Sequence, residues 1–177
     1  MTRRVAFLRA VNLGRRTVPN ARLAEICAEL GYGEPWTFIN SGNVAFDAPG
    51  RREAIEAELG VALEAEFGFE VTTFVRSVAE LRKLVALDPF EVAEGDTYFV
   101  TFLKSPPPAE VARALEGLSN DVDTLVVAGR DVHWRMHGTS MESSLKQKDW
   151  AILGEHATTS RNMTMLRKLI AKLERSR

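Results

Sequence analysis

The chain has 177 residues, of which 45% are hydrophobic and 27% charged, as in a globular protein with one large or two small domains. A formal net charge of −1 argues against general nucleic-acid coating, and no stretch is typical of a membrane span or export signal, so we expect a cytoplasmic protein without a membrane partner. The single cysteine excludes an intramolecular disulfide and a multi-cysteine metal cage.

Charge is distributed unevenly along the chain. The first 24 residues hold six arginines and no Asp or Glu, and residues 156–177 hold six basic residues against Glu174 alone. The stretch 25–155 is acidic, with 11 basic and 23 acidic residues. Either the basic ends neutralise the acidic middle in the folded state, or they supply a local site for an anion.

The first 76 residues predict the element order β-α-β-β-α-β. The apolar pattern gives a strand at 4–11 and a helix at 20–30 that is framed by Pro19 and Gly31. A hairpin around Ser41-Gly42, a second helix at 51–67 and a closing strand with the sequence EVTTFV follow. This order folds most simply into one four-stranded antiparallel sheet with both helices on one face, the ferredoxin-like arrangement.

A third helix is expected between the two halves of the chain. Ser77 and Glu80 form a capping box that opens it, and Asp88-Pro89 ends it. We therefore expect residues 1–89 to form a first ferredoxin-like unit with a linking helix, and residues 96–177 to form a second α+β unit.

The element order repeats in outline in the second half. A strand at 97–103 is followed by a helix after the prolines at 106–108 and by a hairpin across Gly129-Arg130-Asp131. Helices are then expected around 142–153 and at the C-terminus. No closing strand is evident, which favours an incomplete second ferredoxin-like unit within an α+β fold.

A ferredoxin-like sheet leaves one face without helices. If Phe7, Arg9, Val44 and Phe46 point to that face, they present an aromatic and basic platform of the kind that stacks bases. The alternative is that the bare faces pack against each other or against the terminal helix, which hides apolar area from water.

Motifs for metal, nucleotide or acyl-enzyme chemistry gain no support. His133 and His137 share a strand face, but four residues at about 3.3 Å each place them roughly 13 Å apart, whereas two ligands of one ion lie within about 4 Å of each other. Ser143 and Lys146 match SxxK without its companion motifs. No phosphate loop, GxSxG or GxGxxG is present, so we expect no metal and no cofactor.

Five segments carry a family resemblance, namely LRAVNLGRRTVPNARLAEICAELGY, WTFINSGNVAF, VRSVAELRKLVALDPF, YFVTFL and TTSRNMTMLRKL. In order and spacing they resemble the bacterial family catalogued as domain of unknown function 1697 (DUF1697). The resemblance implies a small α+β protein of ferredoxin-like character with no assigned reaction. Ala10, Asn40 and Met163 stand where the family usually has Gly, Gln and Trp.

The resemblance also carries over the polar positions of the family, which lie in the first loop, in the hairpin and before the last helix: Arg9, Asn12, Gly14, Ser41, Gly42, Asn43, Arg161 and Asn162. We take these positions except Gly42, together with Arg15 of the basic first loop, as candidate ligand-binding residues. Turn chemistry alone also explains Asn12, Gly14 and the Ser41-Gly42-Asn43 turn, and an ion pair also explains Arg9.

The sequence thus predicts a protein that binds a small anionic or phosphate-bearing ligand at the basic strand-to-helix loop, with the loop at 12–16 and the Arg161-Asn162 turn as donors. One alternative is an enzyme acting on a phosphorylated metabolite, with Arg9, Asn12 and Arg161 orienting the anion. Another is a nucleic-acid-binding module, which the charge does not favour. The lack of a catalytic motif favours a non-catalytic protein, and the oligomeric state is left open.

Overall fold

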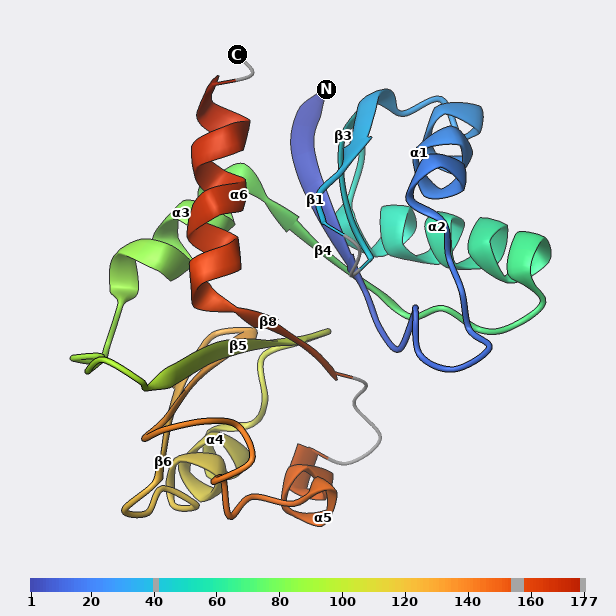
Figure 1. Ribbon diagram of the computed structural model, residues 1–177. Helices are drawn as coiled ribbons and strands as arrows, with labels where there is room; N and C mark the ends of the chain where they lie inside the picture. Colours follow the sequence, from blue (N-terminus) through green and yellow to red (C-terminus); the bar gives the residue numbers. More distant parts are fainter. Residues whose placement is uncertain (40–41, 154–157, 176–177) are drawn as a thin grey trace. The chain divides into compact units, whose positions relative to one another are not determined.

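Two four-stranded antiparallel sheets organise the protein (Figure 1). The computed structural model describes residues 1–39, 42–153 and 158–175. The chain divides into two compact units, Met1–Arg82 and Lys83–Arg177, so the division falls inside helix α3 (Val78–Leu87). The boundary predicted from the sequence lies between residues 89 and 96 instead, after that helix.

The first unit has the ferredoxin-like element order predicted for it. Its elements are β1 (Thr2–Leu8), α1 (Asn20–Glu29), β2 (Gly33–Thr37), β3 (Asn43–Ala48), α2 (Arg52–Phe67) and β4 (Thr73–Ser77). The strands lie in the order β2-β3-β1-β4, with β1 antiparallel to both β3 and β4. The predicted capping box is also present, because the Ser77 and Glu80 side chains each accept a hydrogen bond from the other's backbone N–H.

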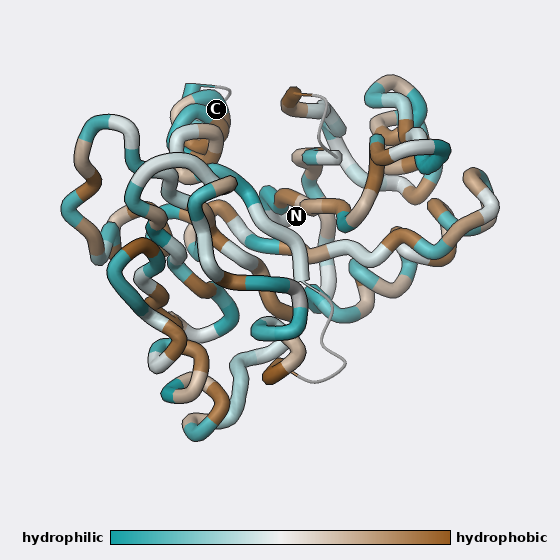
Figure 2. Tube along the Cα trace, turned by 60° about the horizontal axis from the view of Figure 1, so that its bottom comes forward, coloured by the Kyte–Doolittle hydropathy of each residue, from teal (hydrophilic) through white to brown (hydrophobic). Residues whose placement is uncertain are grey.

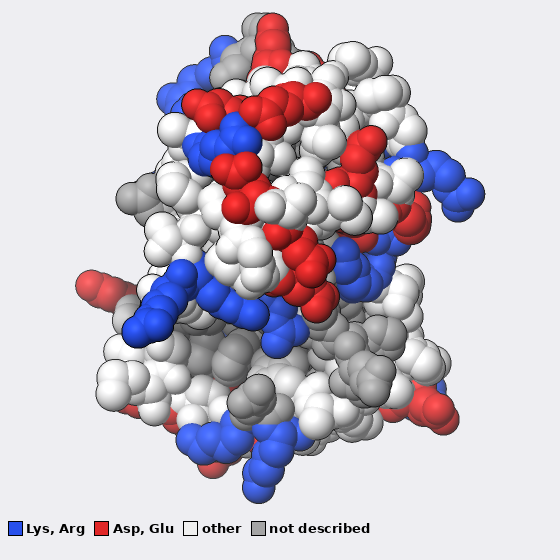
Figure 3. Space-filling model, turned by 90° about the vertical axis from the view of Figure 1, so that its right-hand side faces the viewer, with Lys and Arg blue, Asp and Glu red and all other residues white. Residues whose placement is uncertain are grey.

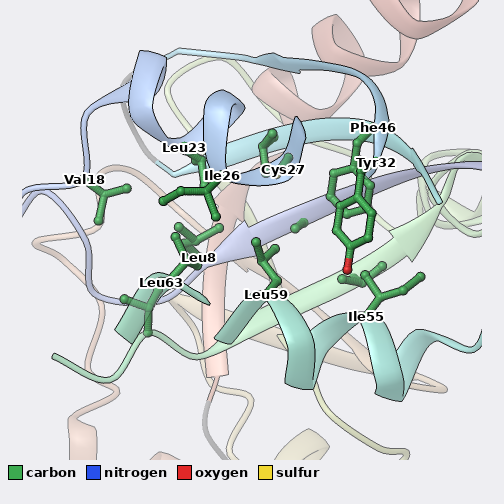
Figure 4. Packing of buried hydrophobic residues seen from close by; sticks show 14 of the residues in the cluster. Leu8, Val18, Leu23, Ile26, Cys27, Tyr32, Phe46, Ile55, Leu59 and Leu63 are labelled. Carbon is green, nitrogen blue, oxygen red and sulfur yellow. The ribbon is translucent and has the colours of Figure 1, made fainter. Parts of the chain in front are cut away.

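The core of the first unit lies between its sheet and the helices α1 and α2 (Figure 4). Tyr32 stacks on Phe46 with ring centroids 4.7 Å apart. Burial raises the pKa of the Cys27 thiol to about 12, so this residue is a neutral core side chain. Around them the sheet and both helices contribute fully or nearly buried aliphatic residues: Ala6, Leu8, Val44, Leu23, Ile26, Ile55, Leu59 and Leu63.

The second unit repeats the strand order and includes a closing strand. Its elements are β5 (Thr97–Leu103), α4 (Ala109–Glu116), β6 (Asp123–Ala128), β7 (Asp131–Met136), α5 (Gln147–Trp150), η1 (Ala151–Leu153), β8 (Thr158–Asn162) and α6 (Met163–Arg175). The order β6-β7-β5-β8 matches that of the first sheet position by position. The expectation of an incomplete unit is therefore wrong. Strand β8 reads TTSRN and has no apolar residue, so hydrophobic alternation could not reveal it.

The predicted helix over 142–153 is also corrected. Only Gln147–Trp150 and the 3-10 turn Ala151–Leu153 are helical. The preceding residues are not helical, and there Ser143 Oγ and the Ser144 N–H both donate to the Asp123 carboxylate, at 2.7 and 3.0 Å. A long-range contact to Asp123 thus overrides the local helical pattern.

Glutamates cap an outer strand in each sheet. In the first unit, Glu56 of α2 accepts the Val75 N–H of edge strand β4 at 2.8 Å. In the second unit, Glu116 of α4 accepts the Val127 N–H of edge strand β6 at 2.9 Å. These donors would otherwise face outward without a partner strand, so each glutamate closes part of an open sheet edge.

Hydrophobic and hydrophilic stretches alternate along the chain (Figure 2). Among the described residues, no helix has both the length and the apolar composition needed to cross a membrane.

Candidate functional site

The loop between β1 and α1 is exposed between two buried anchors. Val11 and Val18 belong to the core of the first unit, at 7% and 1% exposure, whereas every residue from 12 to 17 is exposed. Asn12 organises the loop: its N–H donates to the Arg16 carbonyl at 2.6 Å, and its Oδ1 accepts the Val18 N–H at 3.1 Å. The core thus fixes both ends of a short basic segment whose side chains face water. We call residues 12–17 the basic loop.

The backbone before and within the basic loop takes up left-handed conformations. Ala10, Asn12 and Gly14 have φ of 53°, 59° and 58°. Asn tolerates this region because its short polar side chain bonds locally, and Gly carries no steric cost there. Ala10 has neither advantage, so its left-handed conformation carries a steric cost.

Gly42 of the β2–β3 hairpin packs directly against the chain that leads into the basic loop. Its carbonyl accepts the Leu8 N–H at 2.8 Å, and its φ is +68°. A Cβ at this position would lie 2.5 Å from Val11 Cγ2 and 2.9 Å from Leu8 Cβ. Both the backbone conformation and the lack of space for a side chain therefore require glycine at position 42. From the sequence alone, Gly42 is predicted only to be part of a turn.

We expect Gly42→Ala to lower the free energy of unfolding by about 2 kcal/mol, through the left-handed φ and the displacement of two packed side chains. Urea denaturation would measure the loss. Gly50→Ala is the matched control, because Gly50 also has positive φ, at +89°, but a Cβ there meets nothing within 4 Å. Its cost should be about 1 kcal/mol, from conformation alone. Equal losses in the two variants would contradict the packing argument.

Apart from Arg4, which donates to the Gly50 carbonyl at 3.1 Å, the N-terminal arginines divide into two groups. Arg3 pairs with Glu34 and Asp47, and Arg22 pairs with Glu25, Glu29 and Glu66. Hydrogen bonds to Glu66 and Glu29 raise the pKa of Arg22. For these two side chains, neutralisation by the acidic middle of the chain is the correct interpretation. Figure 3 shows acidic side chains gathered over the side of the first unit that carries α1 and α2.

Arg9, Arg15 and Arg16 form the second group. All three are exposed, and within the described residues none of their guanidinium groups has an ion pair or a hydrogen bond. Arg16 instead lies over the Phe69 ring, with its Cζ 5.2 Å from the centroid. The first unit thus keeps three positive charges at and beside the basic loop that no described carboxylate neutralises.

The hairpin residues have structural roles where they are described. Ser41 and Asn40 lie outside the described residues. Asn43 is fully buried, and its Nδ2 donates to the Phe38 carbonyl at 2.9 Å, while the Phe38 N–H donates back to the Asn43 carbonyl at 3.0 Å. Asn43 therefore closes the hairpin, as the turn interpretation holds.

Arg161 and Asn162 belong to the second unit. Arg161 in β8 is buried, and its Nη1 donates to Thr159 Oγ1 at 2.7 Å and to the Ser160 carbonyl at 2.9 Å. Burial lowers the pKa of Arg161 to about 10. Asn162 caps helix α6 through its Oδ1, which accepts the Thr164 N–H at 2.8 Å. Because Arg9 lies in the first unit, a site shared by Arg9 and Arg161 stays a prediction.

The two histidines and the SxxK serine considered as candidates for metal or acyl-enzyme chemistry lie in the second unit. His133 is fully buried, whereas His137 is exposed and contacts Asp96 at 3.2 Å. The described part of the chain holds no group of three His, Cys, Asp or Glu placed to bind a metal ion. Ser143 of the SxxK string donates to Asp123, which gives it a structural role.

The proposed base-stacking platform is wrong. Val44 pairs with Ala6 and Phe46 pairs with Arg4, so Val44 and Phe46 lie on the helix-covered face of the sheet. Phe7 pairs with Asn43 and is therefore on the opposite face, where it is fully buried. Strand alternation groups residues of one strand correctly, but it does not say which residues of two strands share a face.

Fold and loop together define the class: a small α+β protein of two ferredoxin-like units with an arginine-rich loop in the first. The chain belongs to the family described as Protein of unknown function (DUF1697), whose family model matches residues 1–133. This match confirms the resemblance found in the sequence.

One solved structure is similar over nearly its full length. It is a conserved bacterial protein from Streptococcus pneumoniae, with 18% sequence identity and a TM-score of 0.72 over 98% of this chain and 99% of that chain. At this identity the similarity supports the fold alone. No curated protein matches the chain.

Proposed function

We propose that the first unit binds a small anionic or phosphate-bearing ligand at the basic loop. The observation that carries the proposal is the contrast among its arginines. Arg3 and Arg22 are neutralised by carboxylates, whereas Arg9, Arg15 and Arg16 have no such partner within the described residues. Guanidinium groups match the geometry of phosphate oxygens and form charge-assisted hydrogen bonds with them.

The backbone of the basic loop supports the same ligand. The N–H groups of Gly14 and Arg15 donate to no acceptor within the described residues, and they flank the left-handed turn at Gly14. Successive N–H groups around such a turn form a concave donor surface that suits anions. The loop leads into α1, whose first turn contains no acidic residue to oppose an anion.

Titration with inorganic phosphate, followed by amide NMR, tests this proposal. We expect the largest shift changes at residues 12–17, and we expect Arg9→Ala and Arg15→Ala each to weaken binding by about tenfold through loss of a charge-assisted contact. Binding should weaken as salt concentration rises, because the charges involved are exposed.

Arg51→Ala is the matched control for these variants. Arg51 is exposed, precedes helix α2 and has no ion pair or hydrogen bond of its side chain within the described residues, so it resembles Arg9 and Arg15 in exposure and charge but lies outside the basic loop. We expect phosphate affinity to be unchanged in Arg51→Ala. Shift changes only outside residues 12–17, or an equal loss in Arg51→Ala, would overturn the proposal.

A further inference from the structure

The guanidinium of Arg16 packs on one member of an aromatic pair. Its Cζ lies 5.2 Å from the Phe69 ring centroid, and Phe69 stacks on Phe67 at 6.2 Å with 30° between the ring planes. Both phenylalanines are partly buried and pack against the core of the first unit. An exposed arginine is normally mobile, but this one has a fixed partner under one face of its planar group.

The second face of the Arg16 guanidinium is available for stacking. Arg16 is exposed, and no other ring, ion pair or side-chain hydrogen bond engages its guanidinium within the described residues. A guanidinium plane that rests on one aromatic ring is a stacking surface for a second planar ring, as in recognition of nucleobases. A compact anion such as inorganic phosphate would leave that surface unused.

Leu13 adds an exposed apolar side chain to the same loop. It is 65% exposed, and its backbone forms an isolated bridge with Arg16 across the turn of the basic loop. An exposed aliphatic side chain in the loop suits contact with a planar ring, whereas the charges of Arg9 and Arg15 suit a phosphate. The loop therefore offers one surface for charge and another for a flat, partly apolar group.

We propose that the anion bound by the basic loop is the phosphate of a 5′-phosphorylated nucleoside, whose base stacks on Arg16 over Phe69. This inference rests on the proposed anion site and specifies its ligand class. The same chemical group occurs in a free nucleoside monophosphate and at the 5′ end of a nucleic-acid strand, and the experiment separates these two sources.

The test compares ribose 5-phosphate, adenosine 5′-monophosphate and a 5′-phosphorylated dinucleotide by NMR titration. Adenosine 5′-monophosphate should bind about tenfold more tightly than ribose 5-phosphate, because only the former has a base to stack, and it should shift the Phe69 ring signals. Tighter binding of the dinucleotide than of the mononucleotide supports a strand end as ligand, and weaker binding supports the free nucleotide. Equal affinity for ribose 5-phosphate and adenosine 5′-monophosphate overturns the inference.

Two variants separate stacking from charge. Arg16→Lys keeps the positive charge but removes the planar guanidinium group. Phe69→Leu keeps an apolar side chain but removes the aromatic ring. Each should remove the preference for adenosine 5′-monophosphate over ribose 5-phosphate, so that the two ligands bind the variant with equal affinity. Arg16→Lys affects only an exposed side chain, so it remains informative if Phe69→Leu unfolds the protein, and Arg51→Lys is its control. Preserved preference for the nucleotide in Arg16→Lys overturns the inference.

The two proposals fail in different ways. If inorganic phosphate and ribose 5-phosphate shift the loop amides but the base adds no affinity, the anion site stands and the nucleoside assignment is wrong. If no phosphate compound shifts residues 12–17, the anion site itself is wrong and the nucleoside assignment falls with it.

Discussion

Replacing Asp123 with alanine is expected to lower the free energy of unfolding by about 4 kcal/mol, because a buried carboxylate with several donors is removed. Asp123 is fully buried at the start of β6. Its oxygens accept hydrogen bonds from Trp134 Nε1 at 2.8 Å, Ser143 Oγ at 2.7 Å and the Ser144 N–H at 3.0 Å. Alanine would leave all three donors without their acceptor and would release the segment before α5 from the sheet.

Chemical denaturation at pH 7 would measure this loss, with Asp121→Ala as the control. Asp121 is exposed and lies two residues earlier, and its side chain makes no hydrogen bond or ion pair within the described residues. Its replacement should change stability by less than about 0.5 kcal/mol. A loss of under about 1 kcal/mol in Asp123→Ala would contradict the role we assign to this carboxylate.

The same contacts set the pH range in which Asp123 contributes. Burial raises the pKa of Asp123, but the hydrogen bonds that its carboxylate accepts from Ser143, Trp134, Ser144 and Asn120 lower the pKa by a larger amount. The net shift of the pKa is therefore downward. The unfolded carboxyl therefore takes up its proton at higher pH than the folded one. Its stabilisation is complete above the unfolded pKa of about 4 and is lost as pH falls through the folded value.

Between pH 6.5 and 4 the protein is expected to lose about 3 kcal/mol of unfolding free energy through His133 alone. His133 is fully buried in β7, and its Nδ1 shares a 2.6 Å hydrogen bond with the Tyr98 hydroxyl. Burial lowers the pKa of His133 to about 4, against a smaller upward effect of the Asp88 charge. In this range the unfolded histidine binds a proton that the folded one does not, so acid favours unfolding.

Urea denaturation at several pH values between 7 and 4 tests this expectation, with His133→Gln as the variant. Glutamine cannot titrate but retains a hydrogen-bonding group toward Tyr98, so the variant should be less stable at pH 7 and should lose less stability on acidification. Asp123 contributes little in this window, since its own range lies lower. Identical pH slopes for wild type and His133→Gln would show that His133 is not the responsible group.

Local sequence signals predicted the fold well where a few neighbouring residues decide the structure. The capping box of Ser77 and Glu80 and the strand at 97–103 appear as expected. Strand β8 was missed because its inward position holds Arg161 rather than an apolar residue. The helix over 142–153 was predicted too long because the contacts to Asp123 join residues about 20 positions apart. Such contacts produce no periodic pattern in the sequence.

The candidate site was predictable only in outline. Arginine clustering in the first 24 residues indicated the basic loop, but not which arginines are neutralised. That division depends on partners such as Glu66, which lies 44 residues from Arg22. The Arg16–Phe69 contact was missed for the same reason, and its sequence signal is an aromatic pair at the C-terminal end of α2, with Phe67 as the last helical residue and Phe69 two residues later.

Glutamate capping of the outer strands has a consequence for how copies of this protein behave at high concentration. An open sheet edge is a template on which another chain can add a strand and begin a growing assembly. On β4 and β6 the side chains of Glu56 and Glu116 already occupy one outward donor each, and Glu56 is also held by an ion pair with Arg52 at 2.9 Å. An incoming backbone would have to displace a carboxylate before it could pair, which protects the native protein against self-templated polymerisation along these two edges.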